Sequence, residues 1–286
     1  MRVLLTGATG FVGAQVLKSL QNKSVSIRAI SRQKEFSFSQ YKNITEVVNT
    51  NNFFTESSEW YESICKDIDI IIHLAWYAEP GKYLESPLNL VCLSGTLDFA
   101  HSAAKSGVKK FVGIGTCFEY DLTKSDPLEI DSPLNPLFLY STSKVAAFLS
   151  LSKYFENEGI DFLWNRIFYL YGEGEDDRRL IALLRNKLSS GNSIDLTSGD
   201  HVRDFLDVET AGSLIAESAL GLNIGPFNVC SGKGQSIRQL AEKIADEYGR
   251  RDLLNFGARK DNLSDAPFVV GAVSYTHLTL PTIYSV

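Results

Sequence analysis

The sequence predicts an α/β fold built on a doubly wound parallel sheet, and three features of its 286 residues favour this fold. A glycine-rich turn joins an apolar strand near residue 1 to a helix. Apolar strands then alternate with helical patterns as far as about residue 170. Residues 69–75 form an apolar run that is typical of a parallel strand buried on both faces. Strands that alternate with helices form parallel sheets, because each helix returns the chain to the same edge.

The glycine-rich turn reads Thr6-Gly7-Ala8-Thr9-Gly10-Phe11-Val12-Gly13. It follows the apolar strand at residues 3–5 and precedes apolar residues at helical spacing over 14–20. Gly7 allows a sharp turn off the strand, Gly10 allows the backbone to approach a pyrophosphate, and Gly13 allows the helix to pack closely on the sheet. The free N–H groups at the start of the helix attract phosphate. The turn therefore predicts a dinucleotide site, with an ordinary glycine-rich turn as the alternative.

The second predicted strand, residues 25–30, indicates which dinucleotide would bind. An acidic residue near the end of this strand holds the ribose hydroxyls in NAD-binding proteins. Here the strand runs into Ser31 and Arg32. A hydroxyl and a guanidinium suit a 2′-phosphate. We therefore expect NADP(H) as the preferred cofactor and NAD(H) as the second choice, while a solvated surface arginine is the alternative for Arg32.

The next elements place further residues beside the glycine turn. A strand near residues 45–48 and a helix over 56–65 precede the buried strand at 69–75. The end of that strand, Leu74-Ala75-Trp76, is predicted to lie beside the glycine turn, because ligands gather at the carboxyl ends of parallel strands. Leu74 and Ala75 are expected to contact the cofactor. His73 has no metal-ligand partner at suitable spacing, so we interpret it as structural.

The middle of the chain supplies a candidate acid–base group. A helical pattern at 89–106 leads to a strand at 110–115 that ends at Thr116, and a later helix opens at Tyr140. Tyr140 and Lys144 are four residues apart and share one helix face. An ammonium there is expected to lower the pKa of the phenol from its usual value near 10, and the Thr116 hydroxyl can hold a substrate oxygen. A common surface Tyr–Lys pair is the alternative.

Composition excludes several classes of function. The net charge of −6 without a basic cluster argues against nucleic-acid binding, and no apolar run is long enough to span a bilayer. The N-terminal residues show no signal-peptide pattern. The four cysteines, Cys65, Cys92, Cys117 and Cys230, have neither disulfide nor metal spacing. We expect a cytoplasmic protein without a membrane segment, a metal or a nucleic-acid partner.

With these motifs the sequence resembles the short-chain dehydrogenase/reductase superfamily, specifically its extended sugar-nucleotide epimerase/dehydratase branch. The resemblance covers about residues 1–270 and includes the glycine turn, residues 69–75, Thr116, the Tyr140–Lys144 pair and residues 203–208. It implies a Rossmann-like NAD(P)-binding domain over 1–170 and a smaller substrate domain over 171–272, with some elements interleaved. It also implies a nucleotide-sugar substrate bound between them, and a homodimer as one expected assembly.

The resemblance also implies roles for individual residues. Tyr140 is the expected acid/base, Lys144 its modulator and a ribose ligand, Thr116 the partner of the substrate oxygen, and Arg203 the partner of the sugar nucleotide's diphosphate. An interdomain salt bridge is the alternative for Arg203. The expected cofactor-binding residues are Gly7, Thr9, Gly10, Phe11, Val12, Gly13, Arg32, Leu74, Ala75, Tyr140 and Lys144.

Departures from the family pattern narrow the expected reaction. Cys117 and Phe118 stand where 4,6-dehydratases of this branch carry Asp and Glu, so dehydration is disfavoured. Cys92 replaces a helical Asn, and Tyr169 replaces an Asn that contacts the sugar nucleotide. What remains is a 4-ketoreductase acting on a nucleotide 4-keto-6-deoxyhexose, or a 4-epimerase that keeps its cofactor. A non-catalytic cofactor-binding scaffold stays open as a third class, although such proteins usually lack the Tyr/Lys pair.

The end of the chain departs from the family pattern. Residues 273–286 resemble the translation of a sequencing-library adapter, so we expect a non-native tail after about Gly271 and assign no role to Tyr275 or His277.

Overall fold

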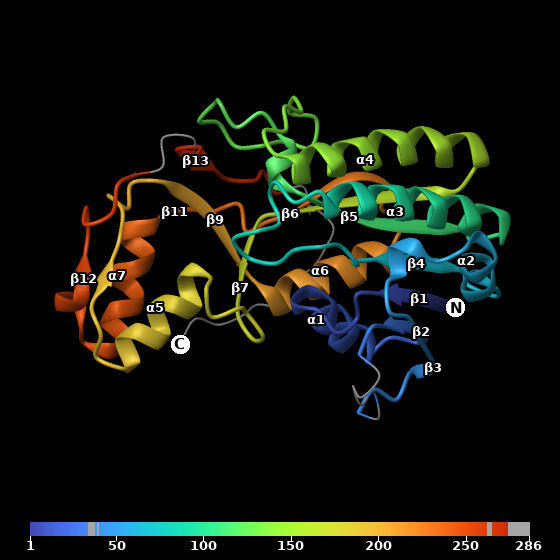
Figure 1. Ribbon diagram of the computed structural model, residues 1–286, viewed down its shortest axis with the longest axis horizontal. Helices are drawn as coiled ribbons and strands as arrows, with labels where there is room; N and C mark the ends of the chain where they lie inside the picture. The colour runs from blue at the N-terminus through green and yellow to red at the C-terminus, as the bar shows by residue number, and fades with distance from the viewer. Residues whose placement is uncertain (34–37, 39, 262–264, 274–286) are drawn as a thin grey trace.

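A seven-stranded parallel sheet forms the centre of the molecule (Figure 1). The computed structural model describes residues 1–33, 38, 40–261 and 265–273. The strand order is β10-β6-β5-β4-β1-β2-β3. The strands are β1 (Arg2–Thr6), β2 (Ser26–Ser31), β3 (Ile44–Asn49), β4 (Ile70–His73), β5 (Lys110–Thr116), β6 (Asp161–Ile167) and β10 (Gly225–Val229). The predicted doubly wound, Rossmann-like sheet is confirmed.

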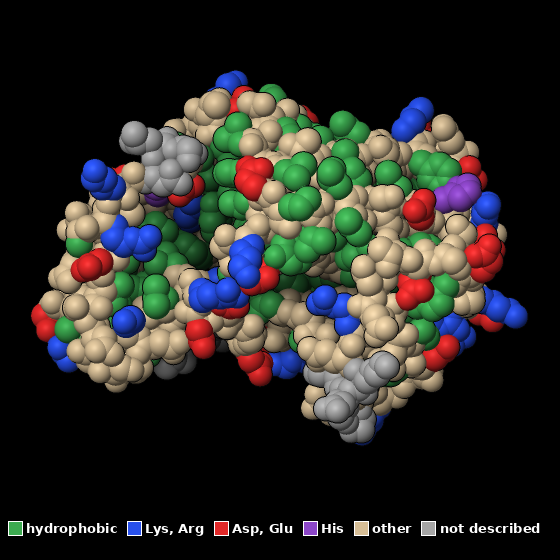
Figure 2. Space-filling model, viewed as in Figure 1, with side chains coloured by type: hydrophobic (Ala, Val, Ile, Leu, Met, Phe, Trp, Pro, Cys, Tyr) green, Lys and Arg blue, Asp and Glu red, His purple; other side chains and the backbone are tan. Residues whose placement is uncertain are grey.

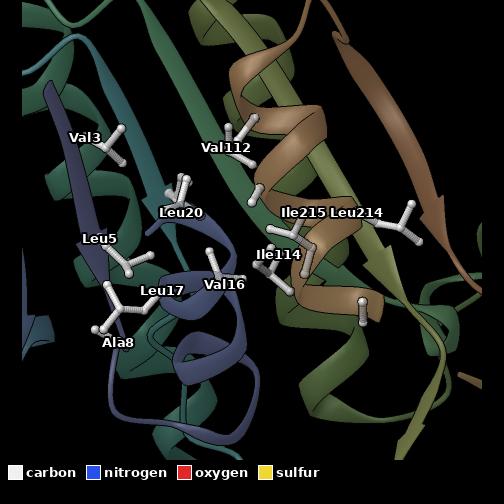
Figure 3. Packing of buried hydrophobic residues seen from close by; sticks show 14 of the residues in the cluster. Val3, Leu5, Ala8, Val16, Leu17, Leu20, Val112, Ile114, Leu214 and Ile215 are labelled. Carbon is white, nitrogen blue, oxygen red and sulfur yellow. The ribbon is translucent and has the colours of Figure 1, made fainter. Parts of the chain in front are cut away.

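Helices cover both faces of this sheet. The helices α1 (Phe11–Leu20) and α6 (Val208–Leu220) lie on one face, and α2 (Ser58–Cys65), α3 (Leu88–Lys105) and α4 (Leu139–Glu158) lie on the other. Successive strand residues point to opposite faces, so in β1 Val3 and Leu5 pack against α1 while Leu4 faces the second group. Figure 3 shows Val16 and Leu17 of α1 beside these strand side chains and Ile215 of α6 packed over β5.

A smaller group of elements lies beside the sheet, at the left of Figure 1. In it β9 (Val202–Asp207) pairs with β11 (Gly234–Ser236), β13 (Phe268–Val269) and β7 (Tyr169–Tyr171), and α5 (Leu180–Ser189) packs on α7 (Ile237–Tyr248). A two-stranded sheet, β8 (Ile194–Asp195) with β12 (Leu254–Asn255), completes it. The domain limits at residues 170 and 272 stay a prediction, since α6 and β10 join the large sheet from the second half of the chain.

Local chemistry explains where the elements begin and end. The first helix starts at Phe11, three residues before the predicted position, because Gly10 is its N-cap. The second starts at Ser58 because the Ser57 hydroxyl accepts a hydrogen bond from the N–H of Trp60 at 3.2 Å. Three short 3-10 turns, η1 (Phe53–Thr55), η2 (Cys117–Glu119) and η3 (Arg251–Leu253), were not predicted.

Two further sequence expectations concern a membrane segment and the C-terminal tail. Within the described ranges, no helix is both long and apolar enough to cross a membrane. Tyr275 and His277, and with them the suspected tail beyond Val273, lie outside the described residues.

Candidate active site

A cavity of about 760 Å³ opens at the carboxyl ends of β1, β2 and β4. Its volume suits a dinucleotide-sized ligand. Six of the predicted cofactor-binding residues line it: Gly7, Thr9, Gly10, Arg32, Leu74 and Ala75. The structure thus brings together residues from three separate strand ends, as expected for a ligand site on a parallel sheet.

The glycine turn is shaped by close backbone contacts. Gly7 has a φ of 70°, and a Cβ on it would lie 2.9 Å from the backbone N of Ala75. The N–H of Gly10 donates to the Gly7 carbonyl at 3.0 Å. No side chain caps the start of α1, so its N–H groups remain available to an anion. A side chain at Gly7 would therefore collide with the backbone of Leu74 and Ala75, just after β4.

Three of the predicted cofactor-binding residues, Phe11, Val12 and Gly13, are not among the described residues that line this cavity. Phe11 and Val12 are partly buried against the core under α1 and, among the described residues, are not part of the cavity wall. A Cβ on Gly13 would clash with the Gly7 carbonyl and lie 2.8 Å from its carbon. Gly13 therefore allows α1 to pack against the turn itself, which supports the cavity indirectly.

The His73 side chain, at the end of β4, links β1 to α3. The Nδ1 of His73 lies 2.8 Å from the Thr6 hydroxyl and its Nε2 lies 3.0 Å from the Thr96 hydroxyl. The Thr6 oxygen also accepts from the N–H of Ala75 at 3.1 Å. Burial, aided by the charge of Lys144, lowers the pKa of His73 to about 3. These contacts are those expected of a structural residue.

Thr116, Tyr140 and Lys144 meet at the end of β5. Thr116 is the last residue of that strand, and its hydroxyl lies close enough to the Tyr140 phenol to lower the pKa of that phenol slightly. Lys144 is 4% exposed and donates from Nζ to the carbonyl of Ile114 at 2.6 Å. The Tyr83 ring packs edge-on against Tyr140, with centroids 4.8 Å apart. Because β5 and α4 are adjacent, residues far apart in sequence form one cluster.

The net pKa shift of Tyr140 is opposite to the lowering that was expected from Lys144, because burial dominates it. Burial raises the pKa of the Tyr140 phenol well above its usual range, with smaller contributions from Tyr83 and Glu119 and a weak opposing one from Thr116. The ammonium of Lys144 points to a backbone carbonyl of β5, and burial lowers its own pKa to about 7. In this arrangement Tyr140 is held as the neutral phenol.

Trp76 separates Lys144 from the cofactor cavity. Its indole lines that cavity, and the Nζ of Lys144 lies 3.7 Å from the ring centroid. The indole N–H donates to the Oδ1 of the buried Asn89 at 2.9 Å. A cation held over an aromatic face is stabilised electrostatically. Trp76 therefore lies where the sequence placed it, at the strand end beside the glycine turn, while its contact with Lys144 was not predicted.

A second cavity, of about 430 Å³, lies where β9, α5 and α7 approach the end of β5. Figure 2 shows the hollow between the part of the molecule that holds α5 and α7 and the larger part that holds the main sheet. The basic side chains in its wall are Arg179, His201, Arg203 and Arg259, and the acidic ones are Glu175 and Asp265. Phe118 and Tyr169 form an aromatic part of the wall with centroids 6.0 Å apart.

Arg203 has contacts that fit both interpretations of the sequence. It is 3% exposed, lines the second cavity, and pairs with Asp265 at 3.0 Å. Its guanidinium also lies 5.4 Å from the centroid of the Tyr169 ring.

Cys117 follows Thr116 directly. Burial raises the pKa of the Cys117 thiol to about 12, so this thiol stays protonated.

Comparisons with known proteins agree with this arrangement. The model of the family described as "NAD dependent epimerase/dehydratase family" matches residues 3–216. The chain is 27% identical over 253 residues to dTDP-6-deoxy-L-talose 4-dehydrogenase (NAD(+)) of Aggregatibacter actinomycetemcomitans, a match that covers 87% of this chain and 91% of that protein.

Solved structures share the fold. A UDP-N-acetylglucosamine 4-epimerase from Methanobrevibacter ruminantium superposes with a TM-score of 0.83 at 22% identity, covering 96% of this chain and 89% of that one. The Thermus thermophilus UDP-glucose 4-epimerase in complex with NAD gives 0.79 at 21% identity, covering 95% and 90%.

Proposed function

Because the chain belongs to the NAD dependent epimerase/dehydratase family, we propose that it is an NAD(P)-dependent enzyme that reduces a nucleotide 4-keto-6-deoxyhexose at C4. The observation that carries this proposal is the cluster of Thr116, Tyr140 and Lys144 beside two cavities. Trp76, in the wall of the first cavity, covers Lys144. Phe118, in the wall of the second, follows Thr116 by two residues.

The first cavity fits a nicotinamide dinucleotide. The turn from Gly7 to Gly10 and the uncapped start of α1 would hold the pyrophosphate, and Leu74 and Ala75 would flank the cofactor. The bound cofactor supplies the hydride for C4. The chain's own groups then control the oxygen of the substrate.

Tyr140 and Thr116 would act on that oxygen. The raised pKa of Tyr140 favours the neutral phenol, which is the form that can donate a proton to the C4 oxygen. The Thr116 hydroxyl would hold the same oxygen, and the positive charge of Lys144 would stabilise the phenolate left after the transfer. The ketone thus becomes a hydroxyl, with the proton supplied by Tyr140.

The second cavity would hold the sugar nucleotide. Arg203, with Arg179 and Arg259 in the same wall, offers donors that match a diphosphate. Phe118 presents an apolar surface near Thr116, and Cys117 stays a neutral thiol. Neither side chain offers the extra acid and base that a dehydration requires, so a simple reduction suits these residues best.

The similarity to a dTDP-6-deoxy-L-talose 4-dehydrogenase supports this choice of substrate class. A 4-epimerase is the second candidate, because two structurally similar proteins are 4-epimerases. A cofactor-binding scaffold would also bind the dinucleotide but would turn over no sugar. Of these three functions, the reductase consumes reduced cofactor, the epimerase interconverts sugars without net consumption, and the scaffold does neither.

Absorbance of the reduced nicotinamide tests the proposal. The protein is mixed with NADPH or NADH and a panel of nucleotide 4-keto-6-deoxyhexoses. We expect stoichiometric oxidation with one or more of these sugars, and a loss of about 10³-fold in kcat in Tyr140→Phe with cofactor binding retained. Interconversion of ordinary sugar nucleotides without net oxidation would support the epimerase, and cofactor binding without either activity the scaffold.

For the cofactor we propose a preference for NADP(H) over NAD(H). Ser31 and Arg32 line the first cavity at the end of β2, and Glu79 is the one carboxylate among the described residues of its wall. Arg32→Ala should raise the KM for NADPH about tenfold or more and leave the KM for NADH nearly unchanged, because only the 2′-phosphate loses a charged partner. Arg185→Ala on α5 serves as the control. Equal KM changes for both cofactors would contradict the preference.

A further inference from the structure

A buried carboxylate lies directly behind the reaction cluster. Glu119, in the η2 turn, is fully buried, and so are its partners Arg166 and Trp164 in β6. Its Oε1 accepts from the N–H of Thr116 at 2.8 Å and from the Nε1–H of Trp164 at 3.0 Å. Its Oε2 accepts from the Nε–H of Arg166 at 2.7 Å. One side chain thus ties the end of β5 to β6.

The partners of Glu119 show its ionisation state. Each contact that the structure gives its carboxylate comes from an N–H donor, so a protonated carboxyl would have no acceptor for its own proton. Burial raises the pKa of Glu119, while the charge of Arg166 and these hydrogen bonds oppose that effect. Paired and hydrogen-bonded in this way, the group is a carboxylate with a fixed position.

The main sheet makes room for this group. A Cβ on Gly113 or Gly115 of β5 would clash with the Trp164 indole, and one on Gly115 would also clash with Glu119. Arg166 is held in turn by Tyr120, whose hydroxyl lies 3.0 Å from its Nη1 and donates to Asn228 at 2.7 Å. The network therefore extends from Thr116 through β6 to β10.

The Trp164 indole also links Glu119 to Lys144. The Nζ of Lys144 lies 5.8 Å from the centroid of the Trp164 ring, whose N–H is bonded to Glu119. We propose that Glu119 is a positioning residue for the reaction: its carboxylate fixes the backbone of Thr116 and holds a permanent negative charge behind the Tyr140–Lys144 pair. This inference rests on the proposed function, because it assigns Glu119 a part in the acid–base work of these two residues.

Other charged groups near Lys144 do not supply this charge. The titratable groups that face its ammonium are His73 from β4, Cys92 from α3, Tyr140 from its own helix and Glu119 from η2, with Arg166 behind Glu119. Among the described residues Glu119 is the one carboxylate in this set. Burial lowers the pKa of Lys144, and the charge of Glu119 opposes that effect more than Cys92 does.

The test removes the charge and keeps the shape. Glu119→Gln should lower the pH at which Lys144 titrates by about one unit. The titration is followed by NMR of ¹³Cε-labelled lysine in the full chain without added ligand, with the Lys144 signal assigned by its loss in Lys144→Arg. In the ketone reduction, the alkaline limb of the kcat profile should move down by a similar amount, because removing the negative charge favours deprotonation of both Lys144 and Tyr140.

Controls separate this effect from damage to the fold. Asp121→Asn removes a nearby carboxylate that hydrogen-bonds Thr123, and it should leave the Lys144 titration unchanged. Glu119→Asp keeps the charge and should restore most of the wild-type profile. If Glu119→Gln folds poorly because Arg166 is left unpaired, Glu119→Gln/Arg166→Met removes both charges and should still lower the titration, by a smaller amount because the loss of the Arg166 cation acts in the opposite direction.

The outcomes distinguish this inference from the proposed function. An unchanged Lys144 titration in Glu119→Gln, with normal turnover, would overturn the role of Glu119 and leave the reductase proposal intact. A lowered titration in a protein that turns over no ketone would support the electrostatic coupling and count against the reductase. A lowered titration together with a shifted kcat profile would support both.

Discussion

At the residue scale, the site depends on charges and phenols that are removed from water. Lys144 has no carboxylate partner in direct contact among the described residues; its Nζ bonds one carbonyl and lies against the indole of Trp76. An ammonium in such a place loses solvation that these contacts replace only in part. Keeping this cation beside Tyr140 therefore lowers the free energy of unfolding of the chain.

This cost makes stability depend on pH. Folding lowers the pKa of Lys144 from 10.5 to about 7, so between these values the unfolded chain binds more protons than the folded one. The stability of the wild type should therefore rise with pH in this window. Lys144→Met lacks this rise, so the wild type should gain about 2 kcal/mol in unfolding free energy relative to the variant between about pH 7 and about pH 9.

Urea unfolding of both proteins at the two pH values, without cofactor, measures this difference. Lys153→Met changes a lysine of the same helix that is 70% exposed, and it should show no such dependence. A difference between wild type and Lys144→Met that stays constant across the window would contradict the prediction.

The sequence predicted part of this cluster. Tyr140 and Lys144 could be found because their spacing places both on one face of α4, and Thr116 because it ends a buried strand. Glu119 was missed because its side-chain partners, Trp164 and Arg166, lie on another strand. A signal was present: Arg166 stands in the otherwise largely apolar strand 161–167, and a buried arginine requires an anionic partner.

At the element scale, the join between β1 and α1 supports the cofactor cavity. The helix packs against α6 on one side and against the glycine turn at its start. Gly13 lies at the closest point, where a Cβ would be 3.1 Å from the Cα of Ala8 and closer still to Gly7. The geometry of the turn thus depends on a residue outside the cavity wall.

Gly13→Ala should therefore lower both stability and cofactor affinity. The added methyl must displace the turn or the helix, at a cost of about 2 kcal/mol in unfolding free energy. In Gly10→Ala the new atom would meet only the Gly7 carbonyl at 3.3 Å, so its effect on stability should be much smaller. Thermal unfolding and cofactor titration measure both variants. Equal stability of the two would show that Gly13 has no packing role.

The sequence predicted the strands of the main sheet but not the short strands around β9. The strands of the main sheet could be predicted because they are short apolar runs between helices, and a helix at 89–106 corresponds to α3. The sheet around β9 could not, because β11 and β13 have only three and two residues and show no period. Within β9, the buried Asp204 carboxylate accepts hydrogen bonds from the N–H groups of Ser231 and Gly232. These residues come together only in the folded chain.

At the scale of the whole molecule, the two cavities are built from different parts of the chain. The first is lined by residues 6–92 and the second by residues 118–265. The cluster of Thr116, Tyr140 and Lys144 lies beside both, and this is the reason to expect chemistry between a bound dinucleotide and a second ligand. The central claim is that a hydride passes from one to the other at a sugar C4.

Isotope transfer tests that claim most directly. The protein is given NADPH that carries deuterium on the transferring face of the nicotinamide, with a nucleotide 4-keto-6-deoxyhexose, and the product is analysed by mass spectrometry and NMR. We expect each product molecule to carry one deuterium at sugar C4, and labelled product to form about 10³-fold more slowly with Tyr140→Phe. A sugar that is converted without gaining deuterium, or is not converted at all, would contradict the account.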